Sequence, residues 1–262
     1  MQILFVGDVV AKSGRRAVFS ALEELSGEYD IDLVVVNGEN AAGGFGITQS
    51  VAEEFFNRGV DVLTTGNHVW DKREALEFIQ NEPRLVRPEN YPPGTPGKGW
   101  TVAVSRTGEK VAVVNTMGRV FMHPDLDCPF RGIDAVLEKI PADIKTILVD
   151  FHAEASSEKV AMGWFLDGRV SAVVGTHTHI PTADERVLPQ GTAFISDVGM
   201  TGCYNSIIGM KVEGSLSRFL NKIPERMEPA NGAATFCAVL IDVDQSTGRA
   251  RSIERITRGQ VL

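Results

Sequence analysis

Cysteine is scarce in this chain, which contains only Cys128, Cys203 and Cys237. Because their number is odd and their spacing wide, they form neither a CxxC zinc pattern nor a disulfide framework. Long apolar runs are also lacking, so the sequence offers no candidate transmembrane helix of about 18 residues. Residues 1–8 run directly into an expected strand, without the basic and apolar regions of a secretion signal. We therefore expect a cytoplasmic protein with no membrane association.

An excess of basic residues is absent as well. The 26 Lys and Arg residues are outnumbered by 34 Asp and Glu residues, and the net charge is −8. This balance argues against long nucleic acid and anionic membranes as partners, since both require a surface that neutralises phosphates. A small phosphate ester held by metal ions is compatible with it. We expect one globular domain over residues 1–262, because α/β folds often reach about 200–250 residues as a single unit.

Hydrophobic periodicity predicts alternating strands and helices. Over residues 1–85 this alternation favours parallel strands joined by right-handed crossovers, whereas 99–116 and 187–257 are richer in adjacent strands. Two packed sheets flanked by helices satisfy both halves. Thr48 and Asp71 are predicted helix N-caps, and Pro88–Gly99 an ordered loop. The expected strands are Ile3–Val6, Leu33–Val36, Val62–Thr64, Val111–Val114, Thr146–Val149 and Ala172–Val174, and the expected helices are Gly14–Glu28, Thr48–Arg58, Arg73–Asn81 and Ile133–Ile140.

Metal-ligating residue types gather where these strands end. Four of the five histidines fall in short motifs that follow apolar runs, and carboxylate and amide residues follow others. The carboxyl ends of parallel strands meet at one rim of a sheet, which is where ligands of open α/β sheets bind. The candidate ligands, in chain order, are Asp8, Glu39, Asn40, Asn67, His152, His177 and His179.

This set is large enough for two metal ions. Glu39 is the natural bridge, because its two carboxylate oxygens can bind one ion each. Asp8 and His179 are expected on one side, where Asn40 can add a carbonyl oxygen, and Asn67, His152 and His177 on the other. The spacing of His177 and His179 puts both imidazoles on the same side of an extended segment.

The same motifs resemble those of the calcineurin-type metallophosphoesterase superfamily. Two positions depart from its pattern: Val10 occupies the place of the usual first histidine, and Glu39 replaces the bridging aspartate. Both departures are similar to the YmdB-like branch, and the similarity extends along most of the chain. The motifs that carry it are Gly7-Asp8, Asn37-Gly38-Glu39-Asn40-Ala41-Ala42-Gly43-Gly44, Gly66-Asn67-His68, Gly175-Thr176-His177-Thr178-His179 and Ser196-Asp197-Val198-Gly199-Met200-Thr201-Gly202.

The resemblance implies an α/β fold, specifically a four-layer α/β/β/α sandwich with two mixed sheets. It also implies a pair of metal ions and phosphodiesterase activity that includes 2′,3′-cyclic nucleotides. Asn40 then stands in for the missing histidine. Iron, as Fe²⁺/Fe³⁺, is the metal that the resemblance favours, although mixed imidazole, carboxylate and amide ligands also suit Mn²⁺ or Zn²⁺.

The expected mechanism is attack on phosphorus by hydroxide that the two metal ions activate. His68 lies next to the ligand Asn67, and we expect it to protonate the departing ester oxygen as a general acid. That role is typically worth about 10²–10⁴-fold in rate, and the superfamily resemblance assigns His68 the same role.

Alternatives remain open at this point. The same centre could serve a broader phosphomonoesterase or nuclease, or a regulatory metal-binding protein without turnover. The glycines of Gly43–Gly46 either let the backbone approach the substrate or form a flexible turn. His123 either lines a substrate lid or lies on a surface loop, and the surface loop is favoured. The sequence is compatible with a homo-oligomer as well as with a monomer.

Overall fold

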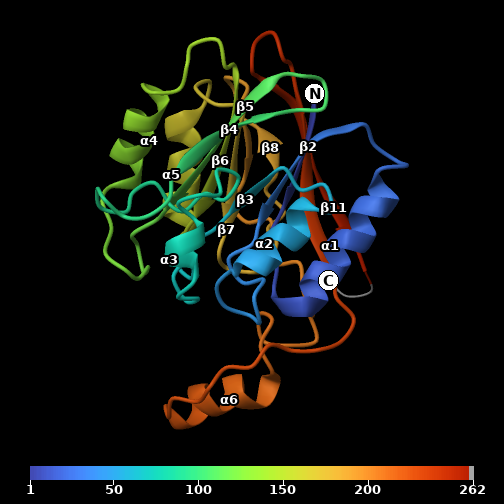
Figure 1. Ribbon diagram of the computed structural model, residues 1–262, viewed down its shortest axis with the longest axis vertical. Coiled ribbons are helices and arrows are strands. Elements are labelled where there is room, and N and C mark those ends of the chain that lie inside the picture. The colour runs from blue at the N-terminus through green and yellow to red at the C-terminus, as the bar shows by residue number, and fades with distance from the viewer. Residues whose placement is uncertain (260–262) are drawn as a thin grey trace.

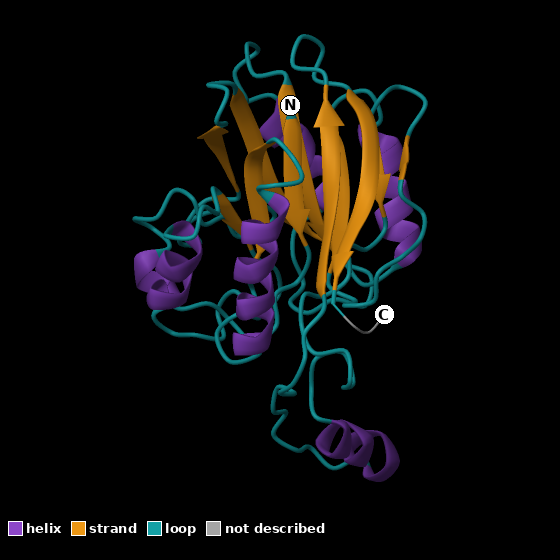
Figure 2. Cartoon of the chain, turned by 90° about the vertical axis from the view of Figure 1, so that its right-hand side faces the viewer, coloured by secondary structure: helices purple, strands orange, loops and turns teal. Residues whose placement is uncertain are grey.

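Two β-sheets pack face to face, and helices cover the outer face of each sheet (Figure 1). The computed structural model describes residues 1–259, so residues 260–262 of the expected domain 1–262 lie outside the described part. In the view of Figure 2 the long strands run side by side between flanking helices. The structure therefore confirms the predicted four-layer α/β/β/α sandwich.

The first sheet has the strand order β11-β10-β1-β2-β3. β1, β2 and β3 are parallel, as the β-α alternation of residues 1–85 predicts. β10 pairs antiparallel with both β1 and β11, which makes the sheet mixed. Its strands are β1 (Gln2–Val6), β2 (Ile31–Asn37), β3 (Val62–Thr64), β10 (Phe236–Val243) and β11 (Ala250–Arg258).

The second sheet has the order β4-β5-β6-β7-β9-β8. Its inner strands β5, β6, β7 and β9 are parallel, while the edge strands β4 and β8 pair antiparallel with their neighbours. This confirms the adjacent strands expected within 99–116 and 187–257. The strands are β4 (Trp100–Val104), β5 (Lys110–Met117), β6 (Thr146–His152), β7 (Ala172–Thr176), β8 (Arg186–Val187) and β9 (Ala193–Ile195).

Helices α1 and α2 cover the first sheet, and α4 and α5 cover the second. Helix α6 stands apart from both layers, at the end of an arm made of two loop segments, one leading to the helix and one returning from it (Figures 1 and 2). Within residues 1–259 no helix is long and apolar enough to cross a membrane. The helices are α1 (Ala11–Leu25), α2 (Gln49–Phe56), α3 (Ala75–Phe78), α4 (Pro129–Leu137), α5 (Ser156–Leu166) and α6 (Val212–Asn221).

Strand β1 shows how the sequence builds these layers. Side chains alternate between the two faces of a strand, and both faces of β1 are buried. Leu4 and Val6 belong to the apolar core under α1 and α2. Ile3 and Phe5 belong to the core between the two sheets. A continuous apolar run is therefore the correct sequence for a central strand that is covered on both sides.

The predicted helices differ in extent from those of the structure. The helix expected over Gly14–Glu28 begins at Ala11 and ends at Leu25, and the helix expected over Ile133–Ile140 begins at Pro129 and ends at Leu137. The helix expected over Arg73–Asn81 contracts to the single turn Ala75–Phe78, because the preceding backbone forms bonds between residues three apart, such as Ala75 N–H to Lys72 O. These are tight turns, in which the four-residue spacing of an α-helix is not reached.

One predicted helix cap is confirmed and the other is wrong. Thr48 precedes α2, and its Oγ1 accepts a hydrogen bond from Val51 N–H at 3.3 Å. Asp71 caps no helix. Its carboxylate instead lies 2.8 Å from Nδ1 of His68, and this side-chain partner competes successfully with the backbone.

The predicted loop Pro88–Gly99 contains no helix or strand, and it is ordered around one buried side chain. The guanidinium of Arg87 donates to the carbonyls of Pro88, Thr95 and Pro96 at 2.7–3.2 Å. Five N–H donors in a rigid fork suit a loop with many backbone acceptors.

We expect the Phe5→Ala substitution to lower the free energy of unfolding by about 3–5 kcal/mol, because it leaves a cavity between the two sheets. The matched control is Val104→Ala on the edge strand β4, where the side chain is 63% exposed. Urea unfolding monitored by circular dichroism measures both. Equal losses in the two variants would contradict the assignment of Phe5 to the core.

Candidate metal centre

The carboxyl ends of strands from both sheets meet at one place. Residues after β1, β2 and β3 approach from the first sheet, and residues that end or follow β6 and β7 approach from the second. The structure brings together all the ligand candidates predicted from the sequence: Asp8, Glu39, Asn40, Asn67, His152, His177 and His179.

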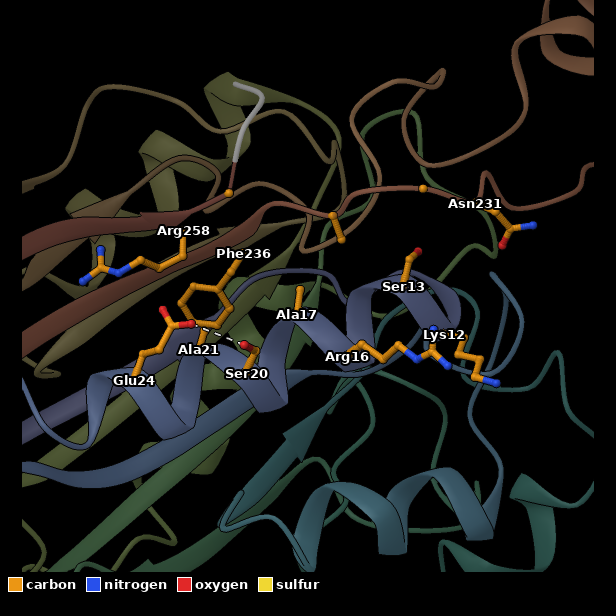
Figure 3. Close-up of a pocket in the computed structure, with 13 residues that line it drawn as sticks. Lys12, Ser13, Arg16, Ala17, Ser20, Ala21, Glu24, Asn231, Phe236 and Arg258 are labelled. Carbon is orange, nitrogen blue, oxygen red and sulfur yellow. Dashed lines mark hydrogen bonds between the residues drawn. The ribbon is translucent and has the colours of Figure 1, made fainter.

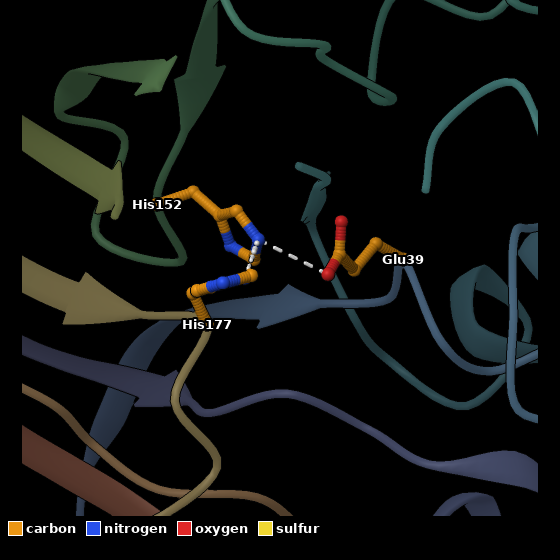
Figure 4. Close-up of side chains that lie close together, drawn as sticks. All are labelled: Glu39, His152 and His177. Carbon is orange, nitrogen blue, oxygen red and sulfur yellow. Dashed lines mark hydrogen bonds and ion pairs between the residues drawn. The ribbon is translucent and has the colours of Figure 1, made fainter. Parts of the chain in front are cut away.

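The centre of this cluster is formed by Glu39, His152 and His177 (Figure 4). Nε2 of His152 lies 3.1 Å from Oε1 of Glu39 and 3.1 Å from Nδ1 of His177. One candidate ligand atom from each residue lies within 4.8 Å of the others. Asn67 joins from the first sheet, with Oδ1 2.9 Å from the same His152 nitrogen.

Asn40, His179 and Asp8 complete the cluster. Nδ2 of Asn40 lies 3.2 Å from both Oε1 of Glu39 and Nε2 of His179. Oδ2 of Asp8 accepts the backbone N–H of His177 at 3.2 Å. Oε1 of Glu39 therefore contacts a residue from each of the two groups expected from the sequence, His152 and Asn40.

Two oxygens of this cluster are buried without a hydrogen-bond donor. Within residues 1–259, neither Oδ1 of Asp8 nor Oδ1 of Asn40 has a partner. A buried acceptor left unsatisfied costs about 1–3 kcal/mol, and more when it is charged. Hard oxygen ligands together with imidazole nitrogens suit divalent or trivalent cations. The residues present therefore fit metal ions.

The electrostatics keep His177 in a form that can bind a cation. Burial and the neighbouring His152 lower the pKa of His177 to about 3, so its ring is neutral. Burial alone would raise the pKa of Glu39, but contacts with His152 and the N–H of His68 lower it to about 2. Burial alone would lower the pKa of His152, but Glu39 and Asp8 raise it to about 9. Without a metal the cluster thus combines an ionised carboxylate, a protonated His152 and a neutral His177, and metal binding would displace the proton from His152.

The orientation of His152 depends on the carboxylate of Asp150, a residue that is not among the candidates from the sequence. Nδ1–H of His152 donates to Thr176 Oγ1 at 2.9 Å, and this hydroxyl donates to Oδ1 of Asp150 at 2.7 Å. The relay holds the ring so that Nε2, once it has lost its proton, would be the nitrogen that binds a metal. A signal was present, because Asp150 precedes His152 by two residues and so shares its face of β6.

The loop that holds His177 and His179 is not extended, contrary to the geometry expected from their spacing. Their φ angles are 103° and 67°, in the left-handed region that side chains disfavour. Thr178, which lies between the two histidines, donates its backbone N–H and its hydroxyl to Oδ2 of Asp197 at 3.1 and 2.8 Å. Nζ of Lys159 lies 2.6 Å from the same oxygen. This buried ion pair therefore anchors the strained loop.

Each histidine of this loop is also held through its second nitrogen. Nε2 of His177 lies 3.2 Å from Oε2 of Glu154, which turns Nδ1 toward the cluster. Nδ1 of His179 donates to the carbonyl of Ile208 at 2.8 Å, which turns Nε2 toward Asn40. Glu154 gave no signal in the sequence, because nothing in its spacing distinguishes it from a surface glutamate.

His68 lies beside the cluster rather than within it. Its backbone N–H donates to Oε2 of Glu39 at 3.1 Å, and its Nδ1 lies 2.8 Å from Oδ2 of Asp71. Its ring packs edge-on against Phe45 at 5.0 Å. Within residues 1–259 its Nε2 has no hydrogen-bond partner. This atom belongs to a side chain that lines a cavity of about 600 Å³ together with His177.

Gly66 allows the segment before Asn67 to lie close to His152 and Glu39. A Cβ atom at this position would lie 2.3 Å from the ring of His152 and 2.4 Å from Oε2 of Glu39. Only glycine fits between these two side chains. The Gly43–Gly46 segment is a turn in which Gly43, Gly44 and Gly46 have positive φ angles.

Other polar features lie outside this cavity. His123 is exposed on its loop and does not line the cavity. A separate hollow of about 520 Å³ follows α1, where Lys12, Arg16 and Arg258 contribute to the lining (Figure 3). That hollow contains none of the predicted ligands, so the chemistry is best sought at the cluster.

The four-layer fold and the position of the cluster define a metallophosphoesterase-like protein. The chain matches the family model of the YmdB-like protein over residues 4–256, and it belongs to that family.

Individual relatives cover nearly the whole chain. A 2′,3′-cyclic-nucleotide 2′-phosphodiesterase of Bacillus subtilis is 49% identical over 256 residues, which are 98% of this chain and 96% of that protein. The crystal structure of a hypothetical protein from Thermus thermophilus has a TM-score of 0.92 at 46% identity and covers 100% of both chains. That of a novel phosphatase from Mycoplasma pneumoniae has a TM-score of 0.92 at 34% identity, covering 99% of this chain and 93% of the other.

We expect Lys159→Met to lower the free energy of unfolding by about 3–5 kcal/mol, because it leaves the buried carboxylate of Asp197 without its counter-ion. The loop with His177 and His179 should then bind metal more weakly. Lys110→Met is the control, since Lys110 forms an exposed ion pair with Asp143. Such pairs contribute about 0–1 kcal/mol. Urea unfolding and metal titration compare the variants, and similar effects would contradict the anchoring role.

We expect Glu39→Gln to bind fewer metal ions per chain than the wild type, because the amide removes the charge and one ligand oxygen of the proposed bridge. Glu154→Gln makes the same chemical change at the edge of the cluster. It should retain the stoichiometry and lose about 10–100-fold in affinity, as do other changes behind a ligand. Elemental analysis after dialysis gives the stoichiometry. Full metal content in Glu39→Gln would refute the bridging assignment.

Proposed function

We propose that this protein is a metal-dependent phosphodiesterase that hydrolyses 2′,3′-cyclic nucleotides, with His68 as the general acid. The observation that carries the proposal is the placement of His68. Its ring is held by Asp71, its Nε2 is unpartnered among residues 1–259, and it lines the same cavity as Glu39 and His177. The name of the Bacillus subtilis relative supports the substrate class.

The proposed ligands are divided around Glu39. Asp8, Asn40 and His179 would hold one ion, and Asn67, His152 and His177 the other, with Glu39 between them. When bound, such ions lower the pKa of a water molecule and neutralise the charge of phosphoryl oxygens. Iron is the proposed metal, with Mn²⁺ or Zn²⁺ as alternatives that the same ligand types accept.

The chain's own contribution to bond cleavage is a positioned proton. As an oxygen from water adds to phosphorus, the bond from phosphorus to one ribose oxygen breaks. Nε2 of His68 donates its proton to that departing oxygen, which leaves as a hydroxyl group. The contact of Nδ1 with Asp71 leaves Nε2 as the ring nitrogen without a hydrogen-bond partner among residues 1–259, on a side chain that lines the cavity.

The setting of His68 favours a catalytic centre over a regulatory one. A centre that only binds metal has no use for an imidazole that ligates nothing and lies 29% exposed in the adjoining cavity. Burial of Asp8 and Glu39 also places both carboxylates where water is excluded and charge interactions are strong. A small phosphodiester is therefore the proposed substrate.

We expect His68→Ala to lower kcat for 2′,3′-cyclic AMP by at least about 10²-fold at unchanged metal content, because the leaving oxygen loses its proton donor. The assay compares iron- or manganese-loaded wild type with the variant, and His123→Ala, an exposed histidine, is the control. Equal activity of wild type and His68→Ala would exclude the general-acid role. An inert wild type would exclude the proposed substrate and favour the phosphomonoesterase, nuclease or regulatory alternatives.

A further inference from the structure

Helix α6 supplies the wall of the cavity that faces the metal centre. Figures 1 and 2 show it at the end of an arm that leaves the main body. The residues of α6 and its C-cap that line the cavity are spaced i, i+3, i+4 and i+7, so they share one face of the helix. They are Ser215, Arg218, Phe219 and Lys222.

This face carries two cations without counter-ions. Within residues 1–259, neither the guanidinium of Arg218 nor the ammonium of Lys222 takes part in an ion pair or a side-chain hydrogen bond. Lys211, on the same arm, differs because it is paired with Glu228 at 2.5 Å. Arg218 and Lys222 share one face of α6, whereas the carboxylates Glu39 and Glu154 line the cavity from the main body. The two cations therefore place positive charge on the α6 wall of a cavity whose proposed substrate is an anion.

The cavity also has room and apolar surface for more than a phosphate group. Its volume of about 600 Å³ falls within the range of about 300–1,000 Å³ typical of small-molecule sites. Phe45, Met210 and Met227 line it together with Phe219. Aromatic and thioether side chains suit the flat, polarisable faces of a nucleobase.

The two ends of the cavity would then bind different anionic groups of the substrate. A 2′,3′-cyclic phosphate carries one negative charge, and the proposed metal centre neutralises it. The cations of α6 lie on a different wall of the cavity, where they can bind a second anionic group of the same molecule. On a nucleotide whose cyclic phosphate occupies the 2′ and 3′ positions, the remaining ribose position for a phosphate is the 5′ oxygen.

We propose that Arg218 and Lys222 recognise a second phosphate on the 5′ side of the nucleotide. This inference rests on the proposed function and narrows its substrate class. The 5′ phosphate belongs either to a free nucleoside 5′-phosphate with a 2′,3′-cyclic phosphate or to the end of a short RNA chain. Arg218 offers a planar fork that matches phosphate oxygens, and Lys222 adds a point charge.

The test compares the KM values of three substrates: adenosine 2′,3′-cyclic phosphate, its 5′-phosphorylated form, and the dinucleotide ApA that ends in a 2′,3′-cyclic phosphate. For wild type we expect the KM of at least one 5′-linked substrate to be lower by about 10-fold or more, as charge-assisted phosphate contacts allow. The double variant Arg218→Ala/Lys222→Ala should bring this ratio close to one. Arg226→Ala, which lies on the same arm and lines a separate hollow, should keep the wild-type ratio.

The outcomes separate this inference from the proposed function. Wild type that is inert on all three substrates refutes the phosphodiesterase proposal. Wild type that turns them over with equal KM values refutes only the role of α6, and so does a double variant that keeps the wild-type ratio. A low KM confined to the dinucleotide identifies an RNA end as the source of the second phosphate, and a low KM confined to the 5′-phosphorylated mononucleotide identifies the free nucleotide.

Discussion

The buried carboxylate of Asp150 joins the two sheets behind the candidate metal centre. Its Oδ2 accepts hydrogen bonds from Thr64 Oγ1 at 2.5 Å and Asn37 Nδ2 at 3.0 Å, both in the first sheet. Its Oδ1 accepts from Thr176 in the second sheet, and Thr176 in turn orients His152. Networks of this kind are costly when incomplete and rigid when satisfied. The same hydrogen-bond network therefore fixes both the packing of the two sheets and the orientation of the candidate ligand His152.

Buried polar contacts also stabilise the strained loop of His177 and His179. Left-handed backbone costs of order 1–3 kcal/mol per residue, and it persists here because Asp197 holds Thr178 through two hydrogen bonds. Lys159 neutralises that carboxylate in the interior. The buried carboxylates differ in their partners rather than in their depth. Within residues 1–259, Oδ1 of Asp8 has no hydrogen-bond partner, whereas Asp150 and Asp197 accept hydrogen bonds on both oxygens.

Much of the fold and all the clustered side chains could be predicted, because strands are read from local apolar runs and parallel strands direct their carboxyl ends to one rim. The roles of Asp197 and Glu154 could not, since each depends on partners from distant segments, and Asp150 was indicated only by sharing a face of β6 with His152. The helix predicted over Arg73–Asn81 was too long, because Asp71 pairs with His68 instead of capping it. The contribution of α6 was also missed. Its cavity face combines cations with Phe219, a pattern that local spacing does not distinguish from a solvated helix.

The division of the candidate ligands between two sheets has a consequence for stability. Asp8, Glu39, Asn40 and Asn67 follow strands of the first sheet, and His152, His177 and His179 end or follow strands of the second. An ion shared by these residues would be a cross-link between layers that are otherwise joined by apolar contact and a few hydrogen bonds. Because such an ion would bind only where both layers supply their ligands, its binding would stabilise the packed sandwich.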